Sequence, residues 1–282
     1  MVGGVGMKTP LYQKILTYFL LLVWVGFTIL PVYWLLSASF KDPSEAMGYP
    51  PTLIPRSFTF GNFYHLLFES SFGLKPYLNS IIIALGATLL STAASVLAGF
   101  GFSNFKFPFY RPLLVGILLL QMVPVMALVI PLFRVYSIYG LYDTRLGLIL
   151  IYGMWTIPMN TWLLKGYFDT MPREMWESAL IDGCSRISAF LRISFPIAAP
   201  GVAAAAIFAF SRAWNEFVLA VILTSRVRPY PVELYRFIGE HGEVSWSMLS
   251  SAAVVAIVPI LIMFSFFQKY FIIGLAGGSV KG

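Results

Sequence analysis

Six long apolar runs constrain this chain more than any other feature of its sequence. A helix needs about 20 residues to cross the hydrocarbon core of a bilayer, and each run is at least that long. None alternates apolar and polar residues as the strands of a membrane barrel do. The sequence therefore predicts an all-α membrane protein with six transmembrane helices, over residues 15–40, 77–102, 112–135, 146–167, 197–224 and 248–273.

The composition excludes an ordinary soluble protein. Of the 282 residues, 59% are hydrophobic and only 11% are charged, whereas soluble domains carry about 25% charged residues. The net charge of +7 comes from basic residues scattered singly between the apolar runs, and nucleic-acid binding needs a basic stripe or cluster. We therefore expect a lipid bilayer and no nucleic acid as the surroundings of this chain.

The orientation follows only weakly from charge. The first run is too long for a signal peptide, whose apolar core spans about 7–15 residues, so we expect it to be retained. An even number of spans places both termini on one side of the membrane. That side carries ten Lys or Arg residues and the other side carries eight, which favours cytoplasmic termini.

The loop between the fourth and fifth runs has the most specific local pattern. Pro172 suits the first turn of a short helix that continues to Asp182, and Ser185 can cap a second helix. The first helix carries an apolar stripe at helical spacing, formed by Trp176, Ala179, Leu180 and Gly183. Such a helix pair either lies on the membrane surface or fits a groove of a partner protein, and the residues alone leave both open.

This loop resembles the EAA motif of ATP-binding-cassette importer permeases, in which Glu-Ala-Ala precedes a Gly and then Ile-x-Leu-Pro. Here three residues separate Glu177-Ser178-Ala179 from Gly183, Asp182 precedes the glycine, and Ile193-Ser194-Phe195-Pro196 follows. Ser178 and Phe195 are mild departures from the motif. Trp214-Asn215-Glu216-Phe217 and the C-terminal stretch 274–282 are similar to patterns of the carbohydrate subfamily, of the maltose-transporter type.

The resemblance implies a type I importer permease fold with a cytoplasmic EAA loop in a prokaryotic inner membrane. It implies four kinds of partner: the bilayer, a second homologous permease subunit, two cytoplasmic ATPase subunits and an extracytoplasmic sugar-binding protein. It also implies a first helix and extracytoplasmic loop (1–75), a permease core (76–273) and a cytoplasmic tail (274–282). The residues that it implies for ATPase coupling are Trp176, Glu177, Ala179, Leu180, Asp182 and Gly183.

ATP chemistry is expected on the partners. The chain has no Gly-x-x-x-x-Gly-Lys-Ser/Thr phosphate loop, so we expect it to bind neither ATP nor Mg and to be no enzyme. His65 and His241 have no second His or Cys at ligand spacing, and we expect no metal site.

Arg212 and Glu216 are unusual because they lie inside an apolar run. A charge at mid-bilayer costs about 2.5–3.5 kcal/mol on insertion scales, so such residues are expected to pair or to face water. Their i, i+4 spacing lets them face each other on one side of a helix. We predict that Arg212, Trp214, Asn215 and Glu216 line the translocation path; the alternative is a structural pair that packs against the second permease.

Three other functions are alternatives to a sugar permease. A secondary transporter needs ionisable residues in several spans, and only the fifth run clearly has them. A membrane enzyme needs a nucleophile–base set or a metal cluster, and the sequence shows neither. A permease for another solute, such as glycerol phosphate, is the closest alternative to a sugar permease.

Overall fold

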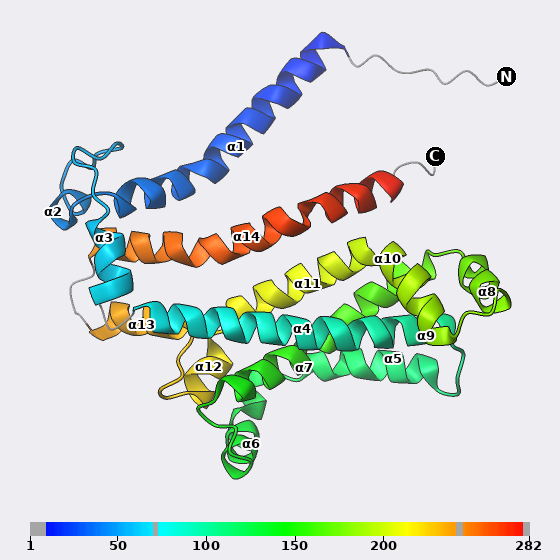
Figure 1. Ribbon diagram of the computed structural model, residues 1–282. Coiled ribbons are helices and arrows are strands. Elements are labelled where there is room, and N and C mark those ends of the chain that lie inside the picture. Colours follow the sequence, from blue (N-terminus) through cyan, green and yellow to red (C-terminus); the bar gives the residue numbers. More distant parts are fainter. Residues whose placement is uncertain (1–9, 70–72, 241–244, 279–282) are drawn as a thin grey trace. The chain divides into compact units, whose positions relative to one another are not determined.

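The computed structural model describes residues 10–69, 73–240 and 245–278, and all regular structure in these ranges is helical (Figure 1). Four described helices are long and apolar enough to cross a membrane: α1 (Leu11–Ser39), α4 (Leu74–Asn104), α7 (Arg145–Asp169) and α14 (Trp246–Gly278, over Trp246–Lys269). Two bent helix pairs raise the number to six if each pair is one span. The predicted all-helical membrane architecture is confirmed.

The third predicted run is broken rather than straight. It forms α5 (Tyr110–Leu119), a 3-10 turn (Leu120–Met122) and α6 (Val125–Ile138), and the two arms meet at an angle of 92°. Val123 is extended, with φ −70° and ψ 120°, because a residue before proline avoids the helical region. Pro124 then stands at the start of α6, where its missing N–H costs no helical hydrogen bond.

The fifth predicted run is also divided. A helical segment precedes it, made of α9 (Arg186–Ala189), a π-helical turn (Phe190–Ser194) and α10 (Phe195–Ile197). This segment meets α11 (Ala199–Trp214) at an angle of 75°. Helix α11 ends at Trp214, and α12 (Val218–Leu223) follows after a short break. The expectation of one continuous helix over residues 197–224 was therefore wrong.

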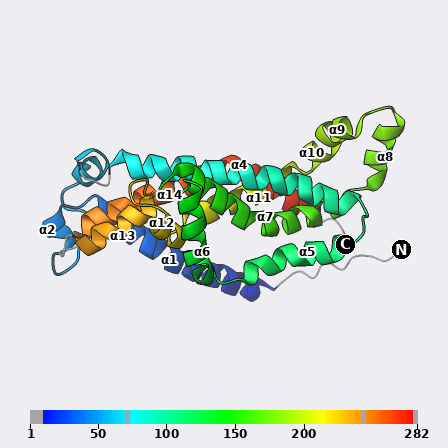
Figure 2. The same cartoon turned by 90° about the horizontal axis from the view of Figure 1, so that it is seen from below.

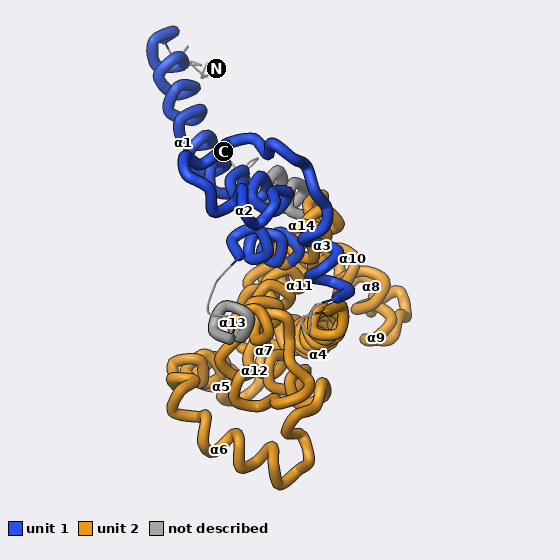
Figure 3. The backbone as a smooth tube through the Cα atoms, turned by 90° about the vertical axis from the view of Figure 1, so that its left-hand side faces the viewer, with its two compact units in different colours: residues 1–70, 241–255 blue, residues 71–240, 256–282 orange. Residues whose placement is uncertain are grey.

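The chain divides into two compact units (Figure 3). The smaller comprises residues 1–70 and 241–255, and its described part contains α1, α2 (Pro43–Ala46), α3 (Gly61–Tyr64) with a π-helical turn (His65–Glu69), and the start of α14. The amide of Asn62 ties this unit together, since it donates to the backbone oxygens of Ser39 at 2.9 Å and Lys41 at 2.8 Å. No residue in the most apolar window of α1 is buried within the chain.

The larger unit comprises residues 71–240 and 256–282, and its core is built by α4, α7 and α11. Gly99 of α4 lets the first two helices touch, because a Cβ there would lie 3.0 Å from the backbone nitrogen of Lys165. Asn160 of α7 is fully buried and donates to Ser91 Oγ at 3.3 Å and to the Ala205 carbonyl at 3.1 Å. One side chain thus links all three helices.

Loops at one end of the larger unit are held by a carboxylate. Asp143, between α6 and α7, accepts backbone N–H bonds from Ser225, Arg226 and Val227 at 2.8, 2.7 and 2.9 Å. Partial burial raises the pKa of this carboxyl group, but the three N–H donors outweigh burial and leave it below its ordinary value. The loop after α12 is thereby fixed beside the start of α7, and α13 (Tyr230–Glu240) follows it.

The opposite end of the larger unit carries α8 (Arg173–Ile181) and α9. Figures 1 and 2 show both short helices at the ends of α4 and α7 that lie away from α6 and α12. Of the predicted tail, residues 274–278 continue α14, and residues 279–282 lie outside the described ranges, as does His241.

Candidate functional site

The turn between α8 and α9 is built by one glycine and one serine. Gly183 has φ +86°, a left-handed conformation that glycine adopts without cost. Its N–H donates to the Leu180 carbonyl at 3.2 Å, and the Cys184 N–H donates to the Ala179 carbonyl at 3.0 Å, which is the Schellman arrangement. Ser185 Oγ then accepts from the Ser188 N–H at 3.2 Å and caps α9. The predicted turn and cap are both confirmed.

The two faces of α8 have different surroundings. Trp176 packs on Phe100 of α4, with ring centroids 5.0 Å apart, and Ala179 is 5% exposed. Leu180 is half-buried, whereas Glu177, Asp182 and Gly183 are exposed. The apolar stripe of α8 therefore begins on the chain's own core, and the acidic residues point to solvent.

A second set of apolar side chains on this element is open to the surroundings. Ile181 at the end of α8 is 85% exposed, and Ile187 of α9 is 72% exposed. Met175 is 46% exposed on the same helix as Ile181. None of these three side chains was among the residues predicted for ATPase coupling, although apolar residues on both sides of α8 were visible in the sequence.

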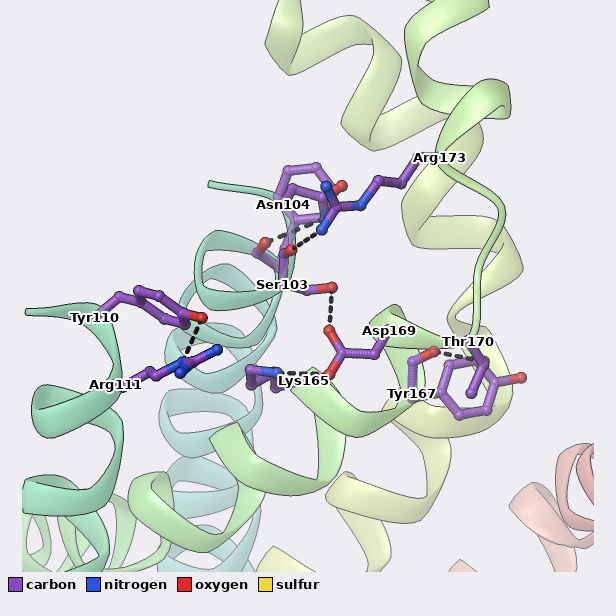
Figure 4. A network of polar contacts seen from close by, with 10 residues as sticks. Ser103, Asn104, Tyr110, Arg111, Lys165, Tyr167, Asp169, Thr170 and Arg173 are labelled. Carbon is purple, nitrogen blue, oxygen red and sulfur yellow. Dashed lines mark hydrogen bonds and ion pairs between the residues drawn. The ribbon is translucent and has the colours of Figure 1, made fainter. Parts of the chain in front are cut away.

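A polar cluster joins α8 to the end of α4, and the end of α4 to the end of α7 (Figure 4). The Asp169 carboxylate of α7 accepts from Ser103 Oγ at 2.7 Å and pairs with Lys165 Nζ at 2.5 Å. Arg173, the first residue of α8, donates to the Ser103 carbonyl at 3.2 Å. Of these three contacts, one joins α8 to α4 and one joins α4 to α7, so α8 is linked to α7 through the end of α4.

The break between α11 and α12 is made by two neighbouring polar residues. Asn215 is the last-turn cap of α11 and donates from Nδ2 to the Ser211 carbonyl at 2.8 Å. The Glu216 carboxylate accepts from the Leu219 and Ala220 N–H groups at 3.0 and 3.2 Å, at the start of α12. A negative group satisfies the unpaired N–H groups of a helix start. Asn215 thus ends one helix and Glu216 begins the next.

The break changes the geometry expected for Arg212. No ion pair joins Arg212 to Glu216 in the part of the chain that the structure describes, because the helix that would have aligned them ends at Trp214. The two side chains instead line one small hollow, of about 20 Å³, with Tyr152, Trp155 and Thr156 of α7.

Trp214 and Asn215, the other two predicted path residues, lie apart from this hollow. Trp214 is 3% exposed, and its Nε1 donates to the Ala256 carbonyl at 3.1 Å. Its ring lies 5.9 Å from that of Phe210. Asn215 is exposed. The structure therefore brings Arg212 and Glu216 together, buries Trp214 in the core and leaves Asn215 at the helix end.

Metal chemistry has no support among the described residues, which contain no group of three or more His, Cys, Asp or Glu side chains close enough to hold an ion. His65 contacts Glu69 at 2.8 Å on the surface of the smaller unit.

Comparison with known proteins assigns the family. Residues 91–274 match the family described as binding-protein-dependent transport system inner membrane component. The chain belongs to this family. Such a protein is a multi-pass component of the inner membrane and serves transport, so the membrane location and the transport class predicted from the sequence are confirmed.

Several relatives of this inner membrane component are named as sugar permeases, and their similarity covers nearly the whole chain. The trehalose/maltose transport system permease protein MalG of Thermococcus litoralis is 33% identical over 98% of this chain and 100% of that protein. The trehalose permease SugB of Mycobacterium tuberculosis is 34% identical over 92% and 94% of the two chains. The maltodextrin permease MdxG of Bacillus subtilis is 34% identical over 96% and 97%. The predicted resemblance to sugar importer permeases is confirmed.

The fold also matches a solved transporter. A chain of a bacterial ABC transporter involved in import of the acidic polysaccharide alginate superposes with a TM-score of 0.80, covering 92% of this chain and 96% of that chain at 19% identity. The predicted importer permease fold is therefore confirmed.

Proposed function

We propose that this chain is one of two permease subunits of an ATP-driven importer for di- or oligosaccharides. An extracytoplasmic sugar-binding protein delivers the solute, and two cytoplasmic ATPase subunits supply the energy. The family and the sugar names of three relatives support this proposal. A second solved form of the alginate transporter contains a pentasaccharide-bound periplasmic protein, which supports the same kind of partner.

The observation that carries the proposal is the two-sided character of α8. Trp176 and Ala179 anchor the helix on the chain's own core, and Arg173 ties it to α4, which Asp169 links to α7. A helix held in this way transmits force to the spans instead of bending away from them. Alternating access then results from rigid-body movement of the packed helices.

The opposite side of the element is available for an ATPase. Ile181 and Ile187 offer apolar anchors on either side of the Gly183 turn, and Glu177 and Asp182 offer charge beside them. Apolar anchors at helical spacing fill grooves of partner proteins. Within the proposed coupling set, Trp176, Ala179 and Leu180 hold the helix in place, and Glu177, Asp182 and Gly183 meet the ATPase.

The orientation and the path complete the proposal. With α8 and α9 in the cytoplasm, both termini are cytoplasmic and residues 40–69 are extracytoplasmic. The proposed path passes Arg212 and Glu216, while Trp214 and Asn215 shape the helix break beside it. ATP and Mg are bound by the partner subunits.

Reconstitution tests the proposal. The chain is purified together with its second permease and ATPase subunits, placed in proteoliposomes, and supplied with the binding protein and maltose, trehalose or maltodextrin. We expect uptake that requires both ATP and the binding protein. Uptake of glycerol phosphate alone, or sugar uptake without ATP, would overturn it.

A matched pair of variants tests the docking face. Ile181→Ser should reduce the amount of ATPase that copurifies with the permease. Ile54→Ser is the control, because Ile54 is 73% exposed in the proposed extracytoplasmic loop. Equal ATPase recovery from both variants would remove α8 from the interface.

A further inference from the structure

A buried hydroxyl without a well-formed hydrogen bond lies beside the helix break. Tyr152 of α7 is 3% exposed, and among the described residues its hydroxyl has no partner at full hydrogen-bond distance and angle. The Glu216 carboxylate is close enough for a looser electrostatic and hydrogen-bonding interaction with this hydroxyl, so the two groups are neighbours without good hydrogen-bond geometry. Leaving a buried polar group unsatisfied costs about 1–3 kcal/mol, and such a group in a native structure calls for an explanation.

The hollow in front of Tyr152 presents both donors and acceptors. Trp155 and Thr156 follow Tyr152 at i+3 and i+4, so all three lie on one face of α7. Arg212 and Glu216 line the opposite wall. Each Glu216 oxygen accepts one backbone N–H and retains further acceptor capacity. Arg212 forms no ion pair with any residue in the described ranges, so its donors are available to a ligand.

The charges select a neutral ligand. A carboxylate in the hollow would face Glu216, and an ammonium group would face Arg212. A hydroxyl group satisfies both walls, since it can accept from Tyr152 or Arg212 and donate to Glu216. Trp155 adds an aromatic surface that is half-exposed beside these groups.

The size of the hollow limits how much of a ligand enters. A volume of about 20 Å³ holds one water-sized group, since a water needs about 10–15 Å³ on this measure. A complete sugar ring is too large. One hydroxyl or hydroxymethyl group fits, with the rest of the ligand outside.

We infer that Tyr152, Arg212 and Glu216 form a subsite for a single hydroxyl group of the transported sugar. This inference rests on the proposed function, and it adds Tyr152, which no sequence pattern indicated, as a residue that discriminates between sugars. The alternative occupant of the hollow is a bound water, which would hydrogen-bond to Tyr152 without contributing to recognition of the solute.

The test combines Tyr152→Phe with singly deoxygenated sugars in the reconstituted importer. Wild type should transport one deoxy analogue less efficiently than the parent sugar, by about 3- to 10-fold, as expected for one hydrogen bond. Tyr152→Phe should lose a similar factor with the parent sugar and show no further loss with that analogue. Thr161→Val is the matched control, because it removes another buried, unpartnered hydroxyl from α7 outside the hollow.

The outcomes separate the subsite from the proposed function. If wild type imports no sugar, the proposed function fails. If wild type imports sugar and Tyr152→Phe preserves its discrimination among the analogues, or slows all of them equally as loss of a bound water would, the subsite inference is overturned. Trp155→Leu is a second variant at a half-exposed position, and it should weaken uptake of the parent sugar even if Tyr152→Phe fails to assemble.

Discussion

Replacing Gly183 with alanine tests the turn between α8 and α9. The glycine has φ +86°, and a Cβ built on it would meet nothing within 4 Å. The cost of alanine is therefore conformational and not steric, about 1–2 kcal/mol for an L-residue in this region. Exposed turns open with little free energy, so the ratio of formed to opened turn should fall about 5- to 30-fold.

The assay for this variant is ATP-driven sugar uptake in proteoliposomes, measured together with ATP hydrolysis. Gly183→Ala should lower the amount of sugar imported per ATP hydrolysed, by up to the factor given for the loss of formed turn. Gly183→Asn should give a value between those of wild type and Gly183→Ala, because asparagine tolerates left-handed φ. Gly140→Ala is the matched control, since Gly140 has φ +66° and equal space but lies between α6 and α7. Equal coupling in the two alanine variants would refute the reasoning.

Gly99→Ala should destabilise the purified complex by about 1–3 kcal/mol through overpacking against α7, whereas Gly101→Ala, with nothing within 4 Å, should not; thermal unfolding measures both. The pKa of Asp143 is lowered, so its carboxylate stabilises the fold above the unfolded pKa of about 3.9, and this contribution is lost as pH falls through the lower folded value. Asp143→Asn should flatten the acid side of the wild-type stability profile. Glu216→Ala removes the cap of α12 and should destabilise by about 1 kcal/mol, and a change below 0.3 kcal/mol would contradict the capping role.

Local chemistry in the sequence was sufficient to predict the α8–α9 turn. Gly183 and Ser185 act through their own backbone neighbours, within five residues of chain. The apolar runs likewise predicted the helical membrane fold, because hydropathy over about 20 residues decides whether a segment crosses a bilayer. Both kinds of inference use interactions that are local in sequence.

The helix breaks were missed for a physical reason. Averaged hydropathy does not register a cap, so Asn215 and Glu216 appeared as polar residues within one helix. Their competing hydrogen bonds with nearby backbone groups end the helices. The direction of Trp176 was equally hidden, because α8 has apolar residues on two faces and only the position of Phe100 decides which one is covered.

The exposed apolar surface of α1 determines which amino-acid substitutions this helix tolerates. Its apolar window contributes nothing to the interior of its own chain, so any constraint on the shape of those side chains originates in neighbouring molecules. A side chain that faces lipid tails needs only to be apolar, so leucine, valine and phenylalanine are interchangeable there. A stripe of α1 that rejects such exchanges would mark where another subunit touches the helix, and a helix tolerant on every side would be surrounded by lipid.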